Sequence, residues 1–305
     1  MNVAIVGGGI CGLSLALNLR QRGIAARIYE RAPEIKPLGV GITLLPHAMR
    51  EFTALGLGDE LLAAGIENRE SCFFNRFGQL IYKEARGKFA GYQYPEVGIH
   101  RGSLHLILYE AARKALGRDD ILLDHDCIGV EQDETAATLH FKGRDSVRAD
   151  VVIACDGINS ALRKQFYPND KVAFAGINTW RGVTRMKPIL GGRSYIRIGS
   201  ILTGKMVVYP IVDNVDDDGN QLINWMAEIK RDTFWPNDWN KPGDRKDFYP
   251  LYENWHFDWL DVAQMIRDAD QILEYPMVDK DPIPRWTFDR VTLAGDAAHP
   301  MYPRG

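Results

Sequence analysis

The chain has 305 residues, a hydrophobic fraction of 46%, a charged fraction of 25% and a formal net charge of −3. This composition is ordinary for a soluble globular protein, and the length predicts one large domain or two interleaved domains. The nearly balanced charge gives no reason to expect nucleic acid or an anionic membrane as a partner.

The four cysteines are scattered and form no CxxC pair, which indicates isolated thiols in a reducing compartment, and no residue is assigned to a metal. The amino terminus carries no basic segment, and glycines interrupt its apolar run after six residues. We therefore expect neither a signal peptide nor a membrane span, and we expect a cytoplasmic protein.

The first thirty residues predict a complete βαβ unit. The apolar run Val3–Val6 indicates a buried parallel strand, and a helical pattern follows from Leu13 with Gly23 as its C-cap. A second strand is expected over Ala25–Tyr29.

The turn of this unit has the GxGxxG spacing of a dinucleotide site. Gly7 would make the tight turn, Gly9 would let a pyrophosphate approach the backbone, and Gly12 would let helix and strand pack closely. Glu30 lies 18 residues after Gly12, near the spacing at which an acid accepts hydrogen bonds from a ribose diol. An acid there disfavours a 2′-phosphate, so the site is expected to hold FAD or NAD, with Arg31 as a further contact.

The next segment predicts a helix over Ala48–Leu57 and a hairpin over Cys72–Ile81 that turns at Gly78. A further helix is expected near residue 100, with Ser103 as a possible N-cap. Arg101 stands at the mouth of this helix. Spacing alone leaves two alternatives open for it, a solvated surface charge or a contact to phosphate or flavin.

Short strands are expected at Ile121–Leu123, Thr138–Phe141 and Val147–Cys155. Asp156 and Gly157 end the last of them, at the sheet edge where ligands bind in open α/β folds. The alternative for Asp156 is a cap on the following helix, and the two roles are compatible.

The second half changes character, because all seven tryptophans lie beyond residue 175. Strands are expected at Gly176–Val183, Tyr195–Ile198, Lys205–Ile211 and Leu222–Ile229, and the acidic segment Asp213–Asn220 is expected to connect the last two. They predict an antiparallel sheet. Its aromatic residues either fill an ordinary half-buried surface or form one wall of a flat pocket for an aromatic ligand.

Towards the end of this half, residues 234–249 are expected to form an irregular surface segment, and a helix is expected at about Leu260–Ala269. A last apolar strand then leads into Gly295-Asp296-Ala-Ala-His-Pro300. This is the third turn of strand-then-Gly/Asp character, after Gly7–Gly12 and Asp156-Gly157.

With the three turns in this order, the chain resembles the single-component FAD-dependent aromatic hydroxylases, the group that includes para-hydroxybenzoate and salicylate hydroxylases. The resemblance covers essentially all 305 residues. Further stretches resemble the phenazine-modifying monooxygenases of this group, which act on 5-methylphenazine-1-carboxylate. These stretches are residues 37–42, 99–102, 176–184, 222–225 and 275–282.

The resemblance implies an α/β fold, α+β overall, in which a Rossmann-like FAD-binding domain with a parallel sheet is interleaved with an antiparallel-sheet substrate domain. Residues 1–72, 98–172 and 284–305 would form the FAD-binding domain, and residues 73–97 and 173–283 the substrate domain. In this group a flavin-facing helix and further C-terminal helices follow the Gly-Asp turn. We expect these helices to be missing from residues 1–305, which predicts weak flavin retention and poor turnover.

The resemblance also implies site residues. Contacts to FAD are expected at the pyrophosphate (Gly7, Gly9, Gly12), the adenosine ribose (Glu30), the flavin and phosphates (Arg101), the adenine (the backbone at Cys127), the ribityl chain (Gly295, Asp296) and the flavin ring (Pro300). Asp156 and Gly157 would serve both FAD and a transient pyridine nucleotide. Tyr209 and Trp225 are the expected substrate contacts.

The implied activity is an FAD-dependent monooxygenase. It would hydroxylate an aromatic carboxylate or a phenazine-like ring, with or without decarboxylation, using NADH or NADPH and O2 through a flavin hydroperoxide. The cofactor carries this chemistry, so no catalytic side chain is assigned. The alternatives are a flavin oxidoreductase of the same fold that inserts no oxygen, and a non-catalytic FAD-binding module. A monomer or a homodimer is expected.

Overall fold

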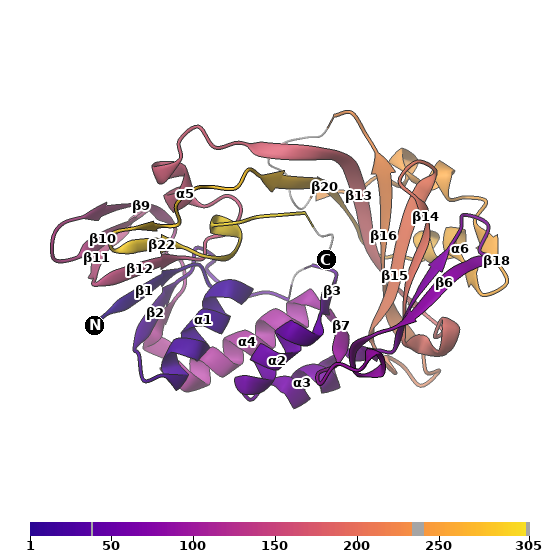
Figure 1. Ribbon diagram of the computed structural model, residues 1–305, viewed down its shortest axis with the longest axis horizontal. Coiled ribbons are helices and arrows are strands. Elements are labelled where there is room, and N and C mark those ends of the chain that lie inside the picture. The colour runs from indigo at the N-terminus through magenta and orange to yellow at the C-terminus, as the bar shows by residue number, and fades with distance from the viewer. Residues whose placement is uncertain (38, 234–240, 303–305) are drawn as a thin grey trace. The chain divides into compact units, whose positions relative to one another are not determined.

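A computed structural model describes residues 1–37, 39–233 and 241–302. Two compact units alternate along the chain (Figure 1): Met1–Pro37, Leu104–Ala173 and Val278–Gly305 form the first, and Leu38–Ser103 with Phe174–Met277 form the second. Residues 39–72 and 98–103 thus belong with the second unit, whereas the sequence assigned them to the FAD-binding domain. Which segments bind FAD stays a prediction.

The first unit is built on a six-stranded sheet, in which β1 is central and parallel to both neighbours, β12 and β2. All four residues of β1 are buried, which explains why this strand is apolar throughout. In sheet order the strands are β21 (Thr287–Phe288), β22 (Val291–Leu293), β12 (Val151–Ala154), β1 (Val3–Val6), β2 (Ala26–Tyr29) and β8 (Ile121–Leu122).

The two faces of this sheet are covered differently. Ala4 and Val6 pack with a meander of three antiparallel strands, whereas Ile5 points to the opposite face, toward helix α1 (Ile10–Gln21). Helix α4 (Arg101–Leu116) packs beside α1, and Arg20 donates a hydrogen bond to the Ala115 carbonyl at 3.0 Å. The meander strands are β9 (Cys127–Gln132), β10 (Ala137–Phe141) and β11 (Arg144–Ala149), and the short helix α5 (Ala161–Phe166) follows β12.

Two sequence expectations are wrong, one at the start of α4 and one at strands β11 and β12. Ser103 is not an N-cap, because α4 begins at Arg101, directly after strand β7 (Glu96–His100), and the Arg101 N–H donates to the Val40 carbonyl. The stretch Val147–Cys155 is not one strand. It divides at Asp150 because β11 pairs antiparallel with β10, while β12 pairs parallel with β1 in the other sheet.

The second unit is built on an eight-stranded sheet. β13, β16, β15 and β14 are antiparallel in succession, and β5 joins β14 in parallel. The acidic segment Asp213–Asn220 connects β15 and β16, as predicted. In sheet order the strands are β17 (Lys241–Pro242), β20 (Ile272–Lys280), β13 (Val172–Met186), β16 (Gln221–Lys230), β15 (Gly204–Val212), β14 (Ser194–Ser200), β5 (Glu70–Phe74) and β6 (Leu80–Ala85).

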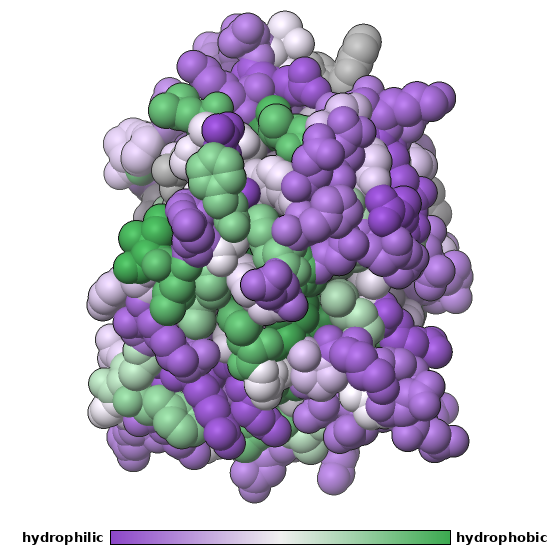
Figure 2. All heavy atoms as spheres, turned by 90° about the vertical axis from the view of Figure 1, so that its right-hand side faces the viewer, coloured by the Kyte–Doolittle hydropathy of each residue, from purple (hydrophilic) through white to green (hydrophobic). Residues whose placement is uncertain are grey.

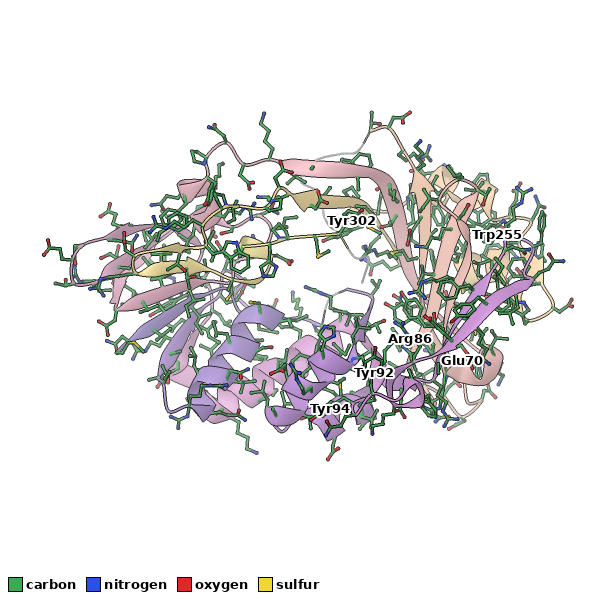
Figure 3. The ribbon with its side chains drawn as sticks, in the orientation of Figure 1. Glu70, Arg86, Tyr92, Tyr94, Trp255 and Tyr302 are labelled. Carbon is green, nitrogen blue, oxygen red and sulfur yellow. The ribbon has the colours of Figure 1, made fainter. Side chains whose placement is uncertain are left out.

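One face of this sheet carries an aromatic core. Trp180 and Trp225 are almost fully buried there with Phe248, next to helix α6 (Val262–Arg267), which is shorter than the predicted helix. Trp255, labelled in Figure 3, belongs to the same core. Of the predicted irregular surface segment, residues 234–240 lie outside the described residues. The part from 241 to 249 contains β17 and short 3₁₀ turns.

The opposite face carries a small sheet, in which β7 lies between β3 (Gly41–Leu44) and β4 (Ile66–Asn68). The predicted helix near residue 50 is α2 (Pro46–Ala54), and the separate helix α3 (Gly58–Ala64) follows it. The predicted hairpin is β5–β6, with a left-handed Gly78 in its turn.

Polar side chains form hydrogen bonds next to the ends of edge strand β6 and its neighbour β5. The Arg86 Nε donates to the buried Glu96 carboxylate at 2.9 Å, and at the start of β5 Glu70 accepts from the Ser194 hydroxyl at 2.8 Å (Figure 3). Figure 2 shows a largely hydrophilic surface with apolar groups between the polar ones. Among the described residues, no helix has the length and apolar character needed to cross a membrane.

Candidate functional site

The GxGxxG turn after β1 has one open position and two crowded ones. A Cβ at Gly7, whose φ is +104°, would lie 2.4 Å from the Cys155 carbonyl oxygen, and a Cβ at Gly12 would lie 2.0 Å from the Gly7 carbonyl oxygen. A Cβ at Gly9 would meet nothing within 4 Å. Gly7 and Gly12 are therefore required by packing, whereas Gly9 leaves the loop surface free for a ligand.

Side chains fix the peptides of this loop. The Gly8 N–H donates to Glu30 Oε2 at 2.6 Å, and the Gly8 carbonyl accepts from His105 Nε2 at 2.7 Å. Because a carbonyl cannot donate, the proton of His105 lies on Nε2. The first N–H groups of α1 have no partner inside the helix and can bind an anion. The sequence contained no signal for His105, which acts 97 residues away from Gly8.

Glu30 lies at the end of β2, as predicted, and also accepts from the Ala32 N–H through Oε1 at 2.8 Å. Each of its carboxylate oxygens keeps a further lone pair that can accept from a ribose hydroxyl. Arg31, the next residue, is exposed.

The turn after β12 holds a carboxylate with an unused oxygen. Asp156 Oδ2 accepts from the Ala161 N–H at 3.0 Å, which is the predicted capping role. Its other oxygen, Oδ1, is buried and has no hydrogen-bond partner among the described residues. Burial raises the pKa of this carboxyl. A buried acceptor without a partner fits a ligand hydroxyl or amide, and the adjacent Gly157 has a left-handed φ of +80°.

The Gly-Asp turn after β22 packs against the start of α1. Gly295 has a φ of +57°, and a Cβ there would lie 2.8 Å from Cys11 Sγ. Cys11 Sγ in turn lies 3.5 Å from Cys155 Sγ, so the three turns meet in one place of the first unit. Asp296 is exposed and Pro300 is buried.

A buried arginine, Arg163, supports this turn, and its role was not predicted from the sequence. Arg163 donates to the carbonyls of Ala297 and Ala298 at 3.2 and 2.8 Å. It also forms two hydrogen bonds to the Asp170 carboxylate, at 2.8 and 3.0 Å. Lys280 Nζ reaches the same carboxylate at 2.8 Å. The backbone beside Asp296 is therefore held by a fully buried cation.

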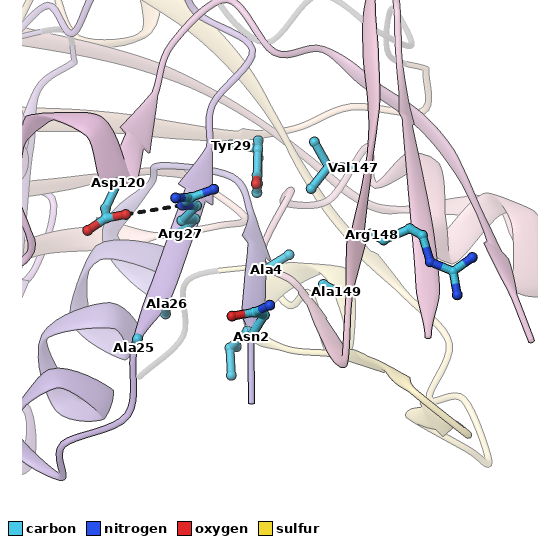
Figure 4. A pocket seen from close by; sticks show the side chains of 11 residues that line it. Asn2, Ala4, Ala25, Ala26, Arg27, Tyr29, Asp120, Val147, Arg148 and Ala149 are labelled. Atoms are coloured by element: carbon cyan, nitrogen blue, oxygen red, sulfur yellow. Dashed lines mark hydrogen bonds and ion pairs between the residues drawn. The ribbon is translucent and has the colours of Figure 1, made fainter. Parts of the chain in front are cut away.

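Two of the depressions formed by the described residues lie on the first unit. One, of about 530 Å³, is lined by Cys127 at the start of β9 together with Asp126, Ile128, Ala161, Lys164 and Gln165. The other, of about 270 Å³, includes Asn2, Ala25 and Arg27 at the amino-terminal ends of β1 and β2 (Figure 4). Ligands of open α/β sheets bind at the carboxyl ends, so the depression in Figure 4 is not the place for a dinucleotide.

Arg101, the remaining predicted FAD contact, belongs to the second unit. Its side chain lies along Gly39, 3.7 Å from where a Cβ of that glycine would stand. Its contact with FAD stays a prediction.

The two predicted substrate residues lie on opposite faces of the eight-stranded sheet. Trp225 is paired with Val208 and Tyr209 with Asn224, and successive residues of a strand face opposite ways. Trp225 is 0% exposed in the aromatic core, with its indole N–H on the Thr184 hydroxyl at 3.0 Å. The two side chains cannot line one pocket.

The face of Tyr209 carries a cluster of aromatic and cationic side chains. The ring of Tyr209 stacks on Tyr195 at 4.9 Å, and burial raises the pKa of both phenols. Arg181 of β13 shares this face, because it is paired with Met226, which is also paired with Val207, two residues before Tyr209.

Arg181 is a half-buried cation on this face of the sheet. Its guanidinium lies 4.8 Å from the Tyr275 ring centre, and its Nε donates to the Thr179 hydroxyl at 3.3 Å. No carboxylate of the described residues forms an ion pair with it. Burial lowers the pKa of Arg181, since the charged form loses its hydration. Such a group is expected to receive an anion.

Comparison with known proteins identifies relatives over the whole length. The chain is 38% identical over 315 residues to phenazine 1,6-dicarboxylic acid hydroxylase of Lysobacter antibioticus, covering 100% of this chain and 77% of that protein. It is 30% identical over 313 residues to 3-amino-4-hydroxybenzoate 2-monooxygenase of Streptomyces platensis, covering 99% and 74%. It is 29% identical over 311 residues to 3-hydroxybenzoate 6-hydroxylase of Polaromonas naphthalenivorans, covering 98% and 73%.

Solved structures share the fold. HpxO of Klebsiella pneumoniae, complexed with FAD and uric acid, superposes with a TM-score of 0.81 at 22% identity, covering 99% of this chain and 74% of that one. The 2,6-dihydroxypyridine-3-hydroxylase of Arthrobacter nicotinovorans superposes with a TM-score of 0.77 at 21% identity, covering 98% and 77%. The predicted fold class is confirmed.

Residues 1–305 match the family described as FAD binding domain. The three turns, the relatives and this match confirm FAD as the cofactor and favour oxygen insertion over the two alternatives, a reductase and a non-catalytic module. The chain belongs to the FAD binding domain family, and it is an FAD-dependent monooxygenase of the aromatic hydroxylase type.

Proposed function

We propose that this monooxygenase hydroxylates a small aromatic ring that carries a carboxylate, with NADH or NADPH as electron donor. The observation that carries the proposal is the half-buried Arg181, which has aromatic neighbours and no ion-pair partner among the described residues. An aromatic carboxylate would supply the missing anion to Arg181 and a flat ring to the Tyr195–Tyr209 stack.

The relatives point the same way. The three named above act, by their names, on a phenazine dicarboxylic acid, an aminohydroxybenzoate and a hydroxybenzoate. All three compounds are aromatic carboxylates. Of the two predicted substrate residues, the proposal keeps Tyr209 and leaves out Trp225, which belongs to the other face of the sheet.

We propose that the three turns of the first unit hold FAD. The open surface at Gly9 and the start of α1 would bind the pyrophosphate, and Glu30 the adenosine ribose. Asp156 Oδ1 would accept a hydrogen bond from the cofactor or from the pyridine nucleotide. The remaining predicted contacts are kept in the proposal: Gly7, Gly12, Arg31, Arg101, Cys127, Gly157, Gly295, Asp296 and Pro300.

When bound, FAD supplies the redox chemistry with NAD(P)H and O2. The protein then has three tasks: to bind the ring, to orient it and to exclude water. Arg181 would fix the orientation, because a planar guanidinium binds a carboxylate through two parallel hydrogen bonds. Buried aromatic side chains such as Tyr209 would keep water away from the ring.

The test pairs a substrate with its neutral analogue. Replacing the guanidinium in Arg181→Met should raise KM for an aromatic carboxylate by about 10- to 100-fold, the equivalent of one charge-assisted hydrogen bond. KM for the matching carboxamide should change by less than about threefold. Arg181→Lys keeps the charge without the planar fork, so it should give an intermediate KM.

The control is Arg185→Met, which removes an exposed arginine of the same strand. Stimulated NADH and NADPH oxidation, with product mass, is the measurement. Equal losses for carboxylate and carboxamide would contradict a role for Arg181 in binding the anion.

The finer parts of the assignment are also proposals. We propose a cytoplasmic monomer or homodimer that binds neither nucleic acid nor membrane. We keep the division into an FAD-binding domain (residues 1–72, 98–172 and 284–305) and a substrate domain (73–97 and 173–283). Limited proteolysis with and without FAD would test the division, because segments that bind the cofactor should gain protection.

A further inference from the structure

Two of the four cysteines meet at the junction of the three turns. Cys11 is the second residue of α1, and Cys155 directly follows β12. They are 144 residues apart in sequence, yet their sulfur atoms lie 3.5 Å apart, and both thiols are free. The sequence, read without the fold, indicated isolated thiols, and for this pair that expectation is wrong.

The other two cysteines have no thiol neighbour. Cys72 lies against the Glu70 carboxylate and Cys127 against the Gly129 carbonyl. Burial raises the pKa of Cys72 to about 11 and that of Cys127 to about 12. Both are therefore poor nucleophiles at neutral pH, and they serve as internal references.

The two thiols differ in pKa and in exposure, and these differences suit them to different steps. The hydrogen bond between the two thiols lowers the pKa of Cys11, and the first turn of α1 adds unpaired N–H groups that favour a thiolate. The same hydrogen bond, together with burial, raises the pKa of Cys155. Cys11 is partly accessible, whereas Cys155 is 7% exposed. Cys11 is thus suited to attack a small oxidant, and Cys155 to be its resolving partner.

We propose that Cys11 and Cys155 form a peroxide-oxidised dithiol pair, a modification site at the centre of the FAD turns. The Cys11 thiolate attacks hydrogen peroxide, the O–O bond breaks, and a sulfenic acid and water result after one proton is taken up. The Cys155 sulfur then attacks the Cys11 sulfur, its S–H proton leaves with the hydroxyl as water, and the S–S bond forms. The two sulfurs together lose two electrons, and one peroxide becomes two waters.

The geometry favours the second step. A disulfide requires sulfurs at about 2.05 Å, so the pair must close by roughly 1.5 Å. The bond would join the start of α1 to the residue after β12, where the Cys155 carbonyl already lies against Gly7 of the turn that precedes α1. The oxidant belongs to the chemistry of this enzyme class, because O2 that accepts two electrons without oxygen transfer becomes hydrogen peroxide.

The experiment maps all four cysteines of the FAD-loaded full chain. The protein is treated with hydrogen peroxide, denatured, alkylated and digested, and each peptide is quantified by mass. The expected result is joint loss of alkylation at Cys11 and Cys155, a linked peptide two hydrogens lighter, and recovery of both thiols with dithiothreitol. The pair should react at least about tenfold faster than Cys72 or Cys127.

Variants separate the two roles. Cys155→Ser should leave Cys11 trapped as a sulfenic acid or its overoxidised forms, and Cys11→Ser should leave the Cys155 thiol unmodified. Cys72→Ser is the matched control and should leave linkage unchanged. The proposal is overturned if the wild-type pair stays reduced, if Cys11 is oxidised without linkage, or if Cys72 reacts as fast. These wild-type outcomes decide the matter even if a variant fails to fold.

Discussion

His105 holds the dinucleotide loop through one hydrogen bond to a backbone carbonyl. The carbonyl of Gly8 and the N–H of Gly9 belong to one trans peptide and point in opposite directions. When His105 fixes the carbonyl at 2.7 Å, it also fixes the direction of the Gly9 N–H, which would face the pyrophosphate in the proposed FAD site. His105 would therefore be a positioning residue for FAD in that site.

This role predicts different outcomes for two variants. His105→Leu should raise the dissociation constant of FAD by about 5- to 10-fold, since one hydrogen bond contributes about 1 kcal/mol. His105→Gln places an amide N–H where Nε2 stood and should recover most of the affinity. Quenching of flavin fluorescence measures both, and His140→Leu, on the meander, is the control. If Gln and Leu bind FAD equally weakly, packing rather than the hydrogen bond is responsible.

The buried carboxylate of Asp156 lowers the stability of the FAD-free protein, and in the proposed site it would bind the cofactor. Its folded pKa is raised, so the stability contributed by this group is fully present below the pKa of the unfolded chain and is lost as pH rises through the folded pKa. Asp156→Asn cannot ionise, so the variant does not lose this stability as pH rises. The FAD-free variant should be about 1–2 kcal/mol more stable than wild type at pH 7, because the neutral amide does not bury a charge, while its FAD affinity falls.

Thermal unfolding of the FAD-free proteins between about pH 4 and 7 measures this effect. The gap in Tm between variant and wild type should widen as pH rises. A constant gap would show that the titration of Asp156 does not contribute.

The sequence could predict those residues whose contacts lie close by in the chain. Gly7, Gly12 and Glu30 make their contacts within or next to one βαβ unit, so their spacing was enough to single them out. His105 and Arg181 act across strands and helices that only the fold brings together. A histidine in a helix and an arginine in a strand have many ordinary roles, and no spacing distinguishes these two.

At the scale of elements, the Arg163–Asp170–Lys280 cluster joins α5 to the end of β20 and to the Gly-Asp turn. Burial alone would raise the pKa of Asp170, but hydrogen bonds from Arg163 and Lys280 outweigh burial and lower it. The stabilisation is therefore present above the ordinary carboxyl pKa of about 4 and is lost as pH falls through the lower folded value.

Asp170→Asn leaves the buried Arg163 without its carboxylate. It should destabilise the protein by about 3–5 kcal/mol at pH 7, and the difference from wild type should shrink in acid. Urea unfolding at several pH values measures this difference. Asp120→Asn, which opens the exposed pair with Arg27, should change stability by less than about 0.5 kcal/mol. Equal effects of the two substitutions would show that burial of the first pair is unimportant.

A helix or strand could be predicted where its local sequence pattern alone determines its structure. β1 and the hairpin β5–β6 follow their local signals. The stretch 147–155 could not be divided from sequence, because β11 and β12 are both extended and only their different partner strands separate them. The N-cap at Ser103 failed for a related reason, since pairing of β7 brings the chain straight into α4.

At the scale of the molecule, the glycines of the GxGxxG turn have different roles, since some are needed for folding and Gly9 is expected to matter only for binding of FAD. Gly9 has a φ of −79°, and a Cβ added there meets no atom within 4 Å, so a small side chain should not disturb the FAD-free protein. Gly9→Val should leave its Tm within about 2 °C of wild type. The same side chain would stand where the pyrophosphate approaches.

FAD at about 100 times its dissociation constant should stabilise the wild type by about 2.7 kcal/mol, and Gly9→Val should lose most of this gain. Gly7→Val is the contrasting variant and should destabilise the FAD-free protein itself, because its φ is +104° and its Cβ would overlap the Cys155 carbonyl. Thermal unfolding with and without FAD gives both comparisons. A Gly9→Val protein with an undiminished FAD shift would contradict the proposed pyrophosphate site.

The interleaving of the two units was expected from the resemblance, but the contact grouping of residues 39–72 and 98–103 was not. These segments carry β3, β4 and β7, which pack on the larger sheet: Gly41 donates to Asn224 at 2.7 Å, and Gly98 lies against Pro210. Such long-range packing leaves no mark in the local pattern of either segment.

The position of β22 in the first unit also sets the order in which this enzyme can be completed during its synthesis. β22 pairs with β12, but about 140 residues leave the ribosome between the two strands. During that time β12 presents an unpaired apolar edge, which is open to wrong pairing with other chains. The turn of Asp296 arrives later still, so in the proposed FAD site the first turn would be available to the cofactor long before the last one. Flavin supply during translation would thus be expected to act on folding yield as well as on activity.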